Sequence, residues 1–294
     1  MIPLFDLSGG VATWLVVVVL LLLALGAGAI GSLVGIGGGL FLVPSLVLLF
    51  GLDIHLAVAA SLLAVVANSC GSGATYVEEG LANLRLGMFL ETATAVGGLF
   101  GALLSVTWLV AQGNLIVLAF VPVVGLSIFL MYGARNERVD PNPPADRVAD
   151  RLALGGSYRE DKGGVEVAYR VTRSGYGLAL VGVAGVASGL LGVGGGTFNV
   201  PAMNAVMNVP IRVATATSTF KIGITATAGA FIYLTAGDVY LLVAAPVVLG
   251  SLVGSLLGSH YQARARATSL RGLFLVVLVI AAISMAARGL GYLT

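Results

Sequence analysis

The sequence predicts an all-α polytopic membrane protein with two inverted repeats, each built from a glycine-broken re-entrant helical hairpin and three spanning helices. The first reason is composition, because 58% of the 294 residues are hydrophobic, 10% are charged, and mean hydropathy is +1.04. A chain with this much apolar surface is expected to be embedded in a lipid bilayer. The second reason is a repeat, since the run GIGGG at 35–39 returns as GVGGG at 192–196. The third is an odd number of predicted crossings in each repeat, which inverts the second repeat relative to the first.

Internal duplication is supported over a long stretch at one constant offset of 157 positions. The offset pairs residues in the glycine runs and in the segments after them: Pro44 with Pro201, Ser61 with Ser218, Tyr76 with Tyr233 and Gly97 with Gly254. A chance match does not hold one offset for about seventy residues. The chain is therefore divided into a first transmembrane repeat, 1–133, a connector loop, 134–174, and a second transmembrane repeat, 175–294.

Each repeat contains apolar runs of spanning length and one shorter apolar piece directly after the glycine run. The spanning runs are about 11–34, 55–77, 87–110 and 114–133 in the first repeat, and 175–191, 211–236, 239–261 and 272–287 in the second. The shorter pieces, 40–50 and 197–208, cover only about half a bilayer. We expect each to be the return arm of a re-entrant hairpin whose first arm is the run before the glycines, 11–34 or 175–191, so that three full crossings remain in each repeat. The first run lacks a basic segment before it, so we expect a retained helix and not a signal peptide.

The segment 134–174 is the polar region of the chain, and it carries eight of the fifteen Lys and Arg residues. Because positively charged loops stay on the inner side, it is predicted to be cytoplasmic and the N-terminus to lie outside. Equivalent positions such as His55 and Arg212 then fall on opposite faces. Within this segment, 139–145 is typical of a linker, and 158–171 resembles a small β-hairpin. Two interpretations stay open, a solvated connector and a regulatory docking surface.

The glycine runs predict a binding site for a small anion at the bilayer midplane. Three glycines precede each half-helix: Gly37, Gly38 and Gly39 in the first repeat, and Gly194, Gly195 and Gly196 in the second. The first amides of a helix have no partner within it and carry the positive end of its dipole, so both tips would direct N–H donors at one site. Close packing of small residues is the alternative. A dinucleotide-binding loop is disfavoured because no strand precedes either run.

Lys221 is predicted to lie near the bilayer centre, about ten residues or about 15 Å into the run that starts at Ile211. A buried ammonium there costs several kcal/mol unless it is paired or hydrated. Because no acidic residue lies within one helical turn of Lys221, a bound anion is the preferred counter-charge. A structural ion pair with Glu91 is the alternative.

Further polar residues are expected to line the same site. They lie just after the second glycine run and in the long runs that follow both half-helices: Thr197, Asn199, Thr217, Ser218, Ser61 and Asn68. Ser61 and Ser218 are favoured because they are equivalent under the repeat. Asn199 can donate to an anion whereas its counterpart Leu42 cannot, so the site is expected to be asymmetric. Bonding to carbonyls of their own helices is the alternative role of the hydroxyls.

Several other classes of function are disfavoured. A net charge of +2 gives no support for a nucleic-acid partner, and the single cysteine, Cys70, allows neither a disulfide framework nor a cysteine cluster for a metal. His55 and His260 lie near span ends without acids at ligand spacing, so no metal or other cofactor is expected. The sequence has no ATP-binding motif, so coupling to protons or to the membrane potential is expected.

With Val43-Pro44 after the first glycine run, Val200-Pro201 after the second and ATATS at 214–218, the chain resembles the sulfite exporter TauE/SafE family. The resemblance covers both repeats and not the connector. It implies an inner-membrane protein of a bacterium or archaeon that exports a small anion, a sulfur oxyanion or an organosulfonate such as sulfite or sulfoacetate.

From the repeat and the glycine runs we expect a secondary transporter that works by alternating access around the midplane site. Its expected partners are the anion, the lipid bilayer and protons as the coupling ion. An anion channel is one alternative. A membrane-embedded enzyme or partner subunit of sulfur metabolism is another, with Cys70 as its available thiol.

Overall fold

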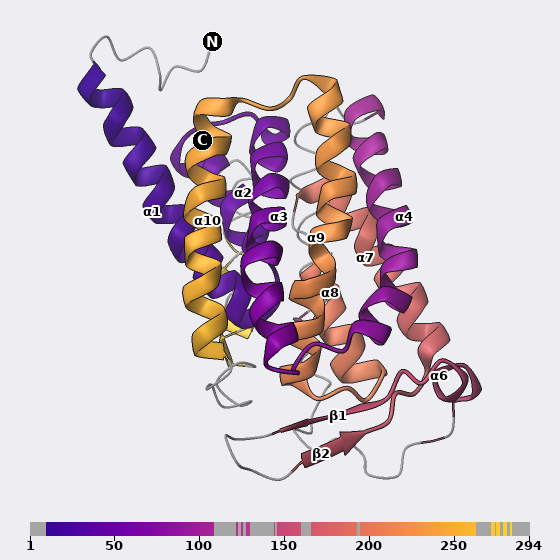
Figure 1. The fold of residues 1–294 in the computed structure, drawn as a ribbon. Coiled ribbons are helices and arrows are strands. Elements are labelled where there is room, and N and C mark those ends of the chain that lie inside the picture. Colours follow the sequence, from indigo (N-terminus) through magenta and orange to yellow (C-terminus); the bar gives the residue numbers. More distant parts are fainter. Residues whose placement is uncertain are drawn as a thin grey trace.

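The computed structural model describes residues 10–108, 144, 146–159, 166–192 and 195–262, together with single helical positions between 122 and 129 and between 272 and 283. The described chain is a helical bundle with a two-stranded sheet at one end (Figure 1). Its elements are α1 (Gly10–Val34), α2 (Gly39–Leu49), α3 (Ile54–Glu78), α4 (Leu84–Trp108), α6 (Arg147–Arg151), β1 (Gly156–Arg159), β2 (Glu166–Tyr169), α7 (Ser174–Leu191), α8 (Gly196–Pro201) with a π-helical turn (Ala202–Val206), α9 (Ile211–Ala236) and α10 (Leu241–Gln262).

Five described helices are long and apolar enough to cross a membrane, as an all-α polytopic membrane protein requires. They comprise Thr13–Val34, Ile54–Glu78, Leu84–Thr107, Ser174–Leu191 and Leu241–Gln262. α9 has 26 residues but is not among the five, because threonines and the charges of Arg212 and Lys221 lower its hydropathy. The predicted spans 114–133 and 272–287, and the N-terminal residues 1–9, lie almost entirely outside the described residues.

The two halves have matching element boundaries at the predicted offset of 157. Four pairs of boundaries differ by this number: the ends of α1 and α7 at Val34 and Leu191, and the starts of α2 and α8 at Gly39 and Gly196, of α3 and α9 at Ile54 and Ile211, and of α4 and α10 at Leu84 and Leu241. The helix contacts show the same correspondence between the halves. α1 packs against α10, and the equivalent α7 packs against α4. Likewise α3 packs against α10, and the equivalent α9 packs against α4. The packing pattern is therefore nearly unchanged when the halves are exchanged.

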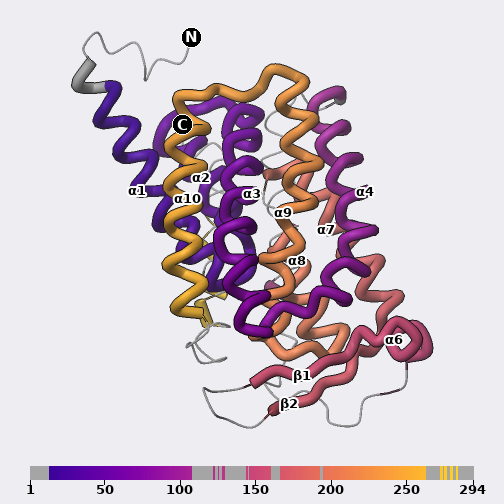
Figure 2. Tube along the Cα trace, in the orientation of Figure 1, coloured from indigo at the N-terminus to yellow at the C-terminus, as the bar shows by residue number. Residues whose placement is uncertain are grey.

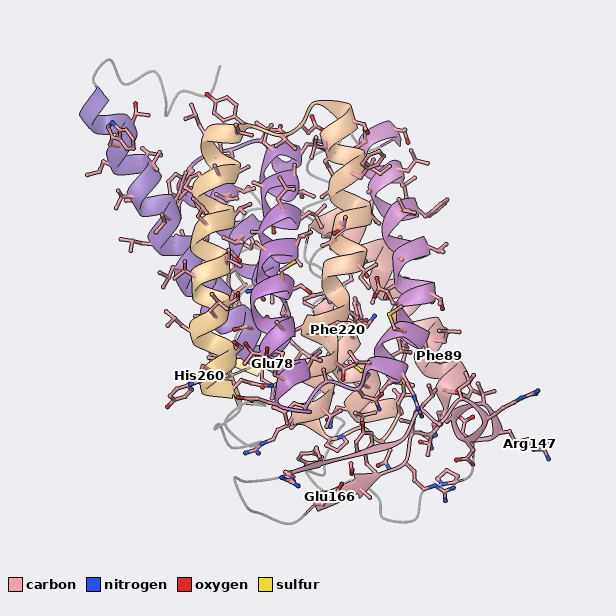
Figure 3. The ribbon with its side chains drawn as sticks, viewed as in Figure 1. Glu78, Phe89, Arg147, Glu166, Phe220 and His260 are labelled. Atoms are coloured by element: carbon pink, nitrogen blue, oxygen red, sulfur yellow. The ribbon has the colours of Figure 1, made fainter. Side chains whose placement is uncertain are left out.

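Equivalent turns of the two halves lie at opposite ends of the bundle. In Figure 1 the α3–α4 turn lies beside the β-hairpin, whereas the α9–α10 turn lies at the far end. Figure 2 traces the same path, with α3 and α9 in the middle, α1 and α10 on one side, and α4 and α7 on the other. Figure 3 places Glu78 and His260 at the same end as Arg147 and Glu166 of the connector. Charged side chains thus gather at the connector end.

Each glycine run makes the tight turn between a long helix and a short one. Gly35 and Gly192 follow the long helices with φ of +84° and +68°, and Gly38 and Gly195 precede the short ones with φ of +84° and +73°. Such left-handed conformations favour glycine, which has no Cβ. α2 has 11 residues, and α8 has 6 followed by a π-helical turn of 5. Each short arm therefore reaches about 16 Å, about half of a bilayer's hydrocarbon core.

The connector contains the predicted β-hairpin and a short helix. β1 and β2 pair antiparallel, with Gly156 opposite Tyr169, so the hairpin starts earlier than the predicted position 158. The Asp146 carboxylate caps α6 and joins it to α7, because it accepts hydrogen bonds from the amides of Val148 at 3.0 Å and Ser174 at 2.6 Å. Burial acts to raise the pKa of Asp146, but these amide hydrogen bonds outweigh it and lower the pKa below its ordinary value.

The connector is docked on the bundle at two places. Asn83, in the α3–α4 turn, donates to the Leu154 carbonyl at 2.8 Å and to the Tyr169 hydroxyl at 2.7 Å. Burial raises the pKa of Tyr169 above its ordinary value, so its hydroxyl stays protonated. Behind β2, the Thr172 amide donates to the Met207 carbonyl, just after the π-helical turn, at 3.1 Å. The connector is therefore tied both to the α3–α4 turn and to the exit of the second hairpin.

Candidate functional site

The tips of the two hairpins lie against each other in the middle of the fold. Ser61 on α3 donates to the Gly192 carbonyl at 2.8 Å, and Ser218 on α9 donates to the Gly35 carbonyl at 2.7 Å. A Cβ on Gly196 would lie 2.4 Å from the Gly35 oxygen, too close for a side chain. The structure brings the two glycine runs together, as one shared site requires. It also shows that the two serines hold the opposite tip in place.

Part of the first glycine run is packed against protein. The Gly37 amide donates to the Gly31 carbonyl at 3.2 Å, and a Cβ on Gly37 would lie 2.5 Å from Ile222. Close packing therefore accounts for Gly37. The amides of Gly39 and Leu40, at the start of α2, make no hydrogen bond within the described residues. These two remain available as donors.

The second tip holds buried polar groups that lack partners. Asn199 is fully buried, and neither its Nδ2 nor its Oδ1 has a hydrogen-bond partner among the described residues. The same holds for the Oγ of Ser188 on α7, which is 1% exposed. Both side chains flank Gly195, since a Cβ there would lie 3.4 Å from Asn199 Nδ2 and 3.5 Å from Ser188 Cβ. A buried amide without a partner is costly, so this cluster is the candidate binding site.

The sequence predicted Asn199 as a site residue and gave no prediction for Ser188, which the structure places beside it at Gly195. The repeat offset could have found it, because Ser188 is equivalent to Gly31 just as Asn199 is equivalent to Leu42. In both pairs the polar residue belongs to the second half. Thr197 is buried in the first turn of α8, whereas Gly194 lies outside the described residues.

Lys221 has a protein counter-charge in this structure. Its Nζ lies 3.5 Å from the Oε2 of Glu91 on α4 and 2.8 Å from the Oγ1 of Thr94, and the lysine is fully buried. The Thr94 and Thr225 hydroxyls donate to the two carboxylate oxygens of Glu91 at 2.9 Å and 2.6 Å. Of the two interpretations of Lys221, the structure shows the ion pair. The preference for a bound anion as its counter-charge is corrected, because the packing of α4 on α9 supplies a carboxylate that the spacing along α9 could not reveal.

Two other predicted site residues have protein partners. Thr217 accepts a hydrogen bond from the Asn83 amide at 2.9 Å, so it lies at the α3–α4 turn and is used there. Asn68 donates to the Gly28 carbonyl of α1 at 2.8 Å, while its Oδ1 has no partner among the described residues. In the part of the chain that the structure describes, no group of three His, Cys, Asp or Glu side chains is placed to hold a metal ion.

Comparison with known proteins gives relatives over nearly the whole chain. A Bacillus subtilis (strain 168) protein named probable membrane transporter protein YunE is 28% identical over 270 residues, which cover 90% of this chain and 94% of that protein. Probable membrane transporter protein YdhB of the same organism is 25% identical over 253 residues, covering 84% and 89%. No solved structure matches. The sequence model of the family described as Sulfite exporter TauE/SafE matches residues 20–285, and the chain therefore belongs to that family of membrane proteins.

Proposed function

We propose that this protein is a secondary transporter that binds a small anion at the junction of the two hairpin tips and exposes it alternately to the two sides of the membrane. The observation that carries the proposal is the Asn199 side chain, buried at this junction with both polar atoms unpartnered among the described residues. An anion offers its NH₂ group an acceptor and so removes the cost of the unpaired donor. The Ser188 hydroxyl and the amides of Gly39 and Leu40 add further donors.

The anion is a sulfur oxyanion or an organosulfonate in this proposal. The family description, Sulfite exporter TauE/SafE, supports that class of substrate, and the names of the two relatives support membrane transport. Such an ion carries several oxygen acceptors around one sulfur atom. A site made of amide, carboxamide and hydroxyl donors, placed where two hairpins meet, suits that shape.

The proposed transporter lies in an inner membrane with the connector in the cytoplasm. The opposite placement of the α3–α4 and α9–α10 turns in Figure 1 supports two inverted repeats. The arginines of the connector support its cytoplasmic location. The short arms, which reach about half of the bilayer, support re-entrant hairpins whose tips meet near the midplane.

A thermal-shift panel on the purified protein in detergent tests this function. Sulfite, thiosulfate, methanesulfonate, sulfate and chloride are compared, and the transported class should raise Tm. A ligand at about a hundredfold excess over Kd adds about 2.7 kcal/mol of stability to the folded state. A failure of every anion to raise Tm contradicts the proposed function.

Two variants locate the site. Asn199→Leu copies the equivalent Leu42, so it should fold and lose the anion-induced rise of Tm. Ser72→Ala is the matched control, because the Ser72 hydroxyl is buried but donates to its own helix at the Asn68 carbonyl, and this variant should keep the rise. A full rise in Asn199→Leu places the anion elsewhere.

A further inference from the structure

The Lys221–Glu91 pair lies in a helix crossing that the protein makes twice. The crossing of α9 on α4 carries the pair, and the equivalent crossing of α3 on α10 does not. In the α3–α10 crossing, Ala64 occupies the position equivalent to Lys221, and Val248 occupies the position equivalent to Glu91. Ser251 replaces Thr94 and donates to the Ala64 carbonyl at 3.0 Å. The fold therefore makes this crossing without charges, and the ion pair is not needed for it.

A buried ion pair that the fold does not need requires another explanation. Desolvation of two charges can exceed their mutual attraction, so such pairs are weak contributors to stability. Inside a membrane, ionisable residues are rare and mark paths of ions or protons. Glu91 is the one carboxylate among the described helices that lies away from a helix end.

The surroundings of Glu91 accommodate a proton. Its carboxylate accepts from the hydroxyls of Thr94 and Thr225, and Lys221 lies closer to the Thr94 hydroxyl, at 2.8 Å, than to the carboxylate, at 3.5 Å. A hydroxyl can donate or accept, and a protonated carboxyl keeps acceptor capacity. A proton on Oε2 of Glu91 can be donated to the Thr94 hydroxyl oxygen, because the Thr94 hydrogen can turn to the Leu90 carbonyl, 3.0 Å away, while Lys221 keeps its bond to Thr94.

Other ionisable side chains do not compete for this role. The helices around the pair carry ionisable groups in their first or last turns, together with one cysteine: Arg85 on α4, Arg212 and Tyr233 on α9, His55, Tyr76, Glu78 and Cys70 on α3, and Tyr176 on α7. Cys70, away from the helix ends, is exposed on the surface of the bundle. Among the described residues, Lys221 and Glu91 are thus the charged side chains that are buried away from the helix ends, whereas the buried His55 lies in the first turn of α3.

The pair lies close to the proposed anion site through two short paths. Ile222, the neighbour of Lys221 in the chain, packs on Gly37 of the first tip. On the other side, the Thr94 carbonyl packs against Gly185 of α7, and the carbonyl of the adjacent Ala184 lies 3.6 Å from the Cβ position of Gly195. Because the interior has a low dielectric constant, a change of charge at Glu91 alters the electrostatic potential at both tips.

We propose that Glu91 binds the coupling proton and that this proton and the anion bind together. This inference rests on the proposed function and names its coupling residue. With Lys221 charged and Glu91 ionised, the interior is neutral, and an anion adds an uncompensated negative charge. A proton on Glu91 leaves the charge of Lys221 to balance the anion. Each ligand therefore raises the affinity for the other, by the same factor.

The test measures anion affinity and proton uptake against pH on the purified protein in detergent. Methanesulfonate is the probe, because a sulfonate does not itself titrate near neutral pH. For the wild type, affinity should rise as pH falls, by up to about tenfold per pH unit, with a proton taken up on binding in a weakly buffered solution containing a pH-indicator dye. Glu91→Gln should bind methanesulfonate with an affinity that does not change with pH and without proton uptake.

Two further variants complete the test. Glu78→Gln removes an exposed acid at the end of α3, and it should keep the wild-type pH dependence. The double variant Glu91→Val with Lys221→Ala copies the uncharged α3–α10 crossing, so it should fold and show no proton uptake even if the single variant is unstable. Wild-type pH dependence and proton uptake in Glu91→Gln or in the double variant overturn the proposal while leaving the anion site intact. Absence of anion binding in every protein overturns the proposed function itself.

Discussion

The two hairpin tips share a backbone and differ in chemistry. Both have left-handed glycines at equivalent positions, and each is held by a serine of the other half. The first tip is lined by Gly31 and Leu42, whereas the second has Ser188 and Asn199 in their places, with unpartnered polar atoms. The second short helix also gives way to a π-helical turn after Pro201, whereas α2 continues as α-helix past the equivalent Pro44. The repeated halves thus share one frame, and the polar groups lie in the second copy alone.

The largest contrast between the halves is expected in their orientation. With Cys70 replaced by Ala, cysteines at Glu79 and Ala236 are equivalent under the repeat, and both positions are exposed. A membrane-impermeant thiol reagent applied to intact cells should label position 236 and spare position 79 until the membrane is opened. Labelling of both positions from one side would make the halves parallel.

The next contrast concerns the charged and uncharged helix crossings. Lys221→Met alone should lower the free energy of unfolding by about 3–5 kcal/mol, because it leaves the Glu91 carboxylate buried without its partner. The double variant Glu91→Val with Lys221→Ala should recover most of that loss. Thermal unfolding in one detergent measures both. Equal stability of the single variant and the wild type would show that the pair is not charged in the folded protein.

Alanine at the two equivalent glycines should separate packing from binding. Both positions have positive φ, so each change strains the backbone by about 1–2 kcal/mol. At Gly38 the new Cβ also meets the Ala27 carbonyl at 2.9 Å, whereas at Gly195 the nearest atom is Asn199 Nδ2 at 3.4 Å. Gly38→Ala should therefore lower Tm more, and Gly195→Ala should lower methanesulfonate affinity more. Equal effects of the two variants on Tm and on affinity would remove the distinction between the tips.

The smallest effect is expected in the connector, outside the bundle. Because the pKa of Asp146 is lowered in the fold, its contribution to stability is complete above the ordinary carboxyl pKa and is lost as pH falls through the lowered value. Asp146→Ala should cost about 1 kcal/mol through loss of the cap. Hydrogen exchange should show less protection of the Val148 and Ser174 amides, relative to their intrinsic exchange rates, in the variant at neutral pH, and in the wild type only under acidic conditions. Unchanged exchange in the variant would mean that the cap does not hold the connector.

Most of the helical frame could be predicted because local sequence determines it. Apolar runs mark spanning helices, and the constant offset of 157 aligns their boundaries, so the predicted run 211–236 coincides with α9. The hairpin turns were also predictable, since glycine runs permit left-handed backbone. The predicted run 87–110 began late, because Leu84 and Arg85 form the first turn of α4 at the charged end.

The partners of polar side chains could not be predicted in the same way. Glu91 lies 130 positions before Lys221, and only helix packing brings them together. Thr217 lies one turn before Lys221 on α9, yet it bonds to the Asn83 amide. Spacing along a helix shows that two residues share a face, but not which neighbouring helix that face meets.

The reciprocal serine bonds make each half structurally incomplete by itself. Gly35 of the first half is held by Ser218 of the second, and Gly192 of the second by Ser61 of the first. A single ancestral unit, before duplication, could close its hairpin in this way only against a second copy of itself. The single chain thus contains, between its own halves, the kind of reciprocal contact that two identical subunits make across a dimer interface, and joining the halves in one chain lets Asn199 and Ser188 occur on one side alone.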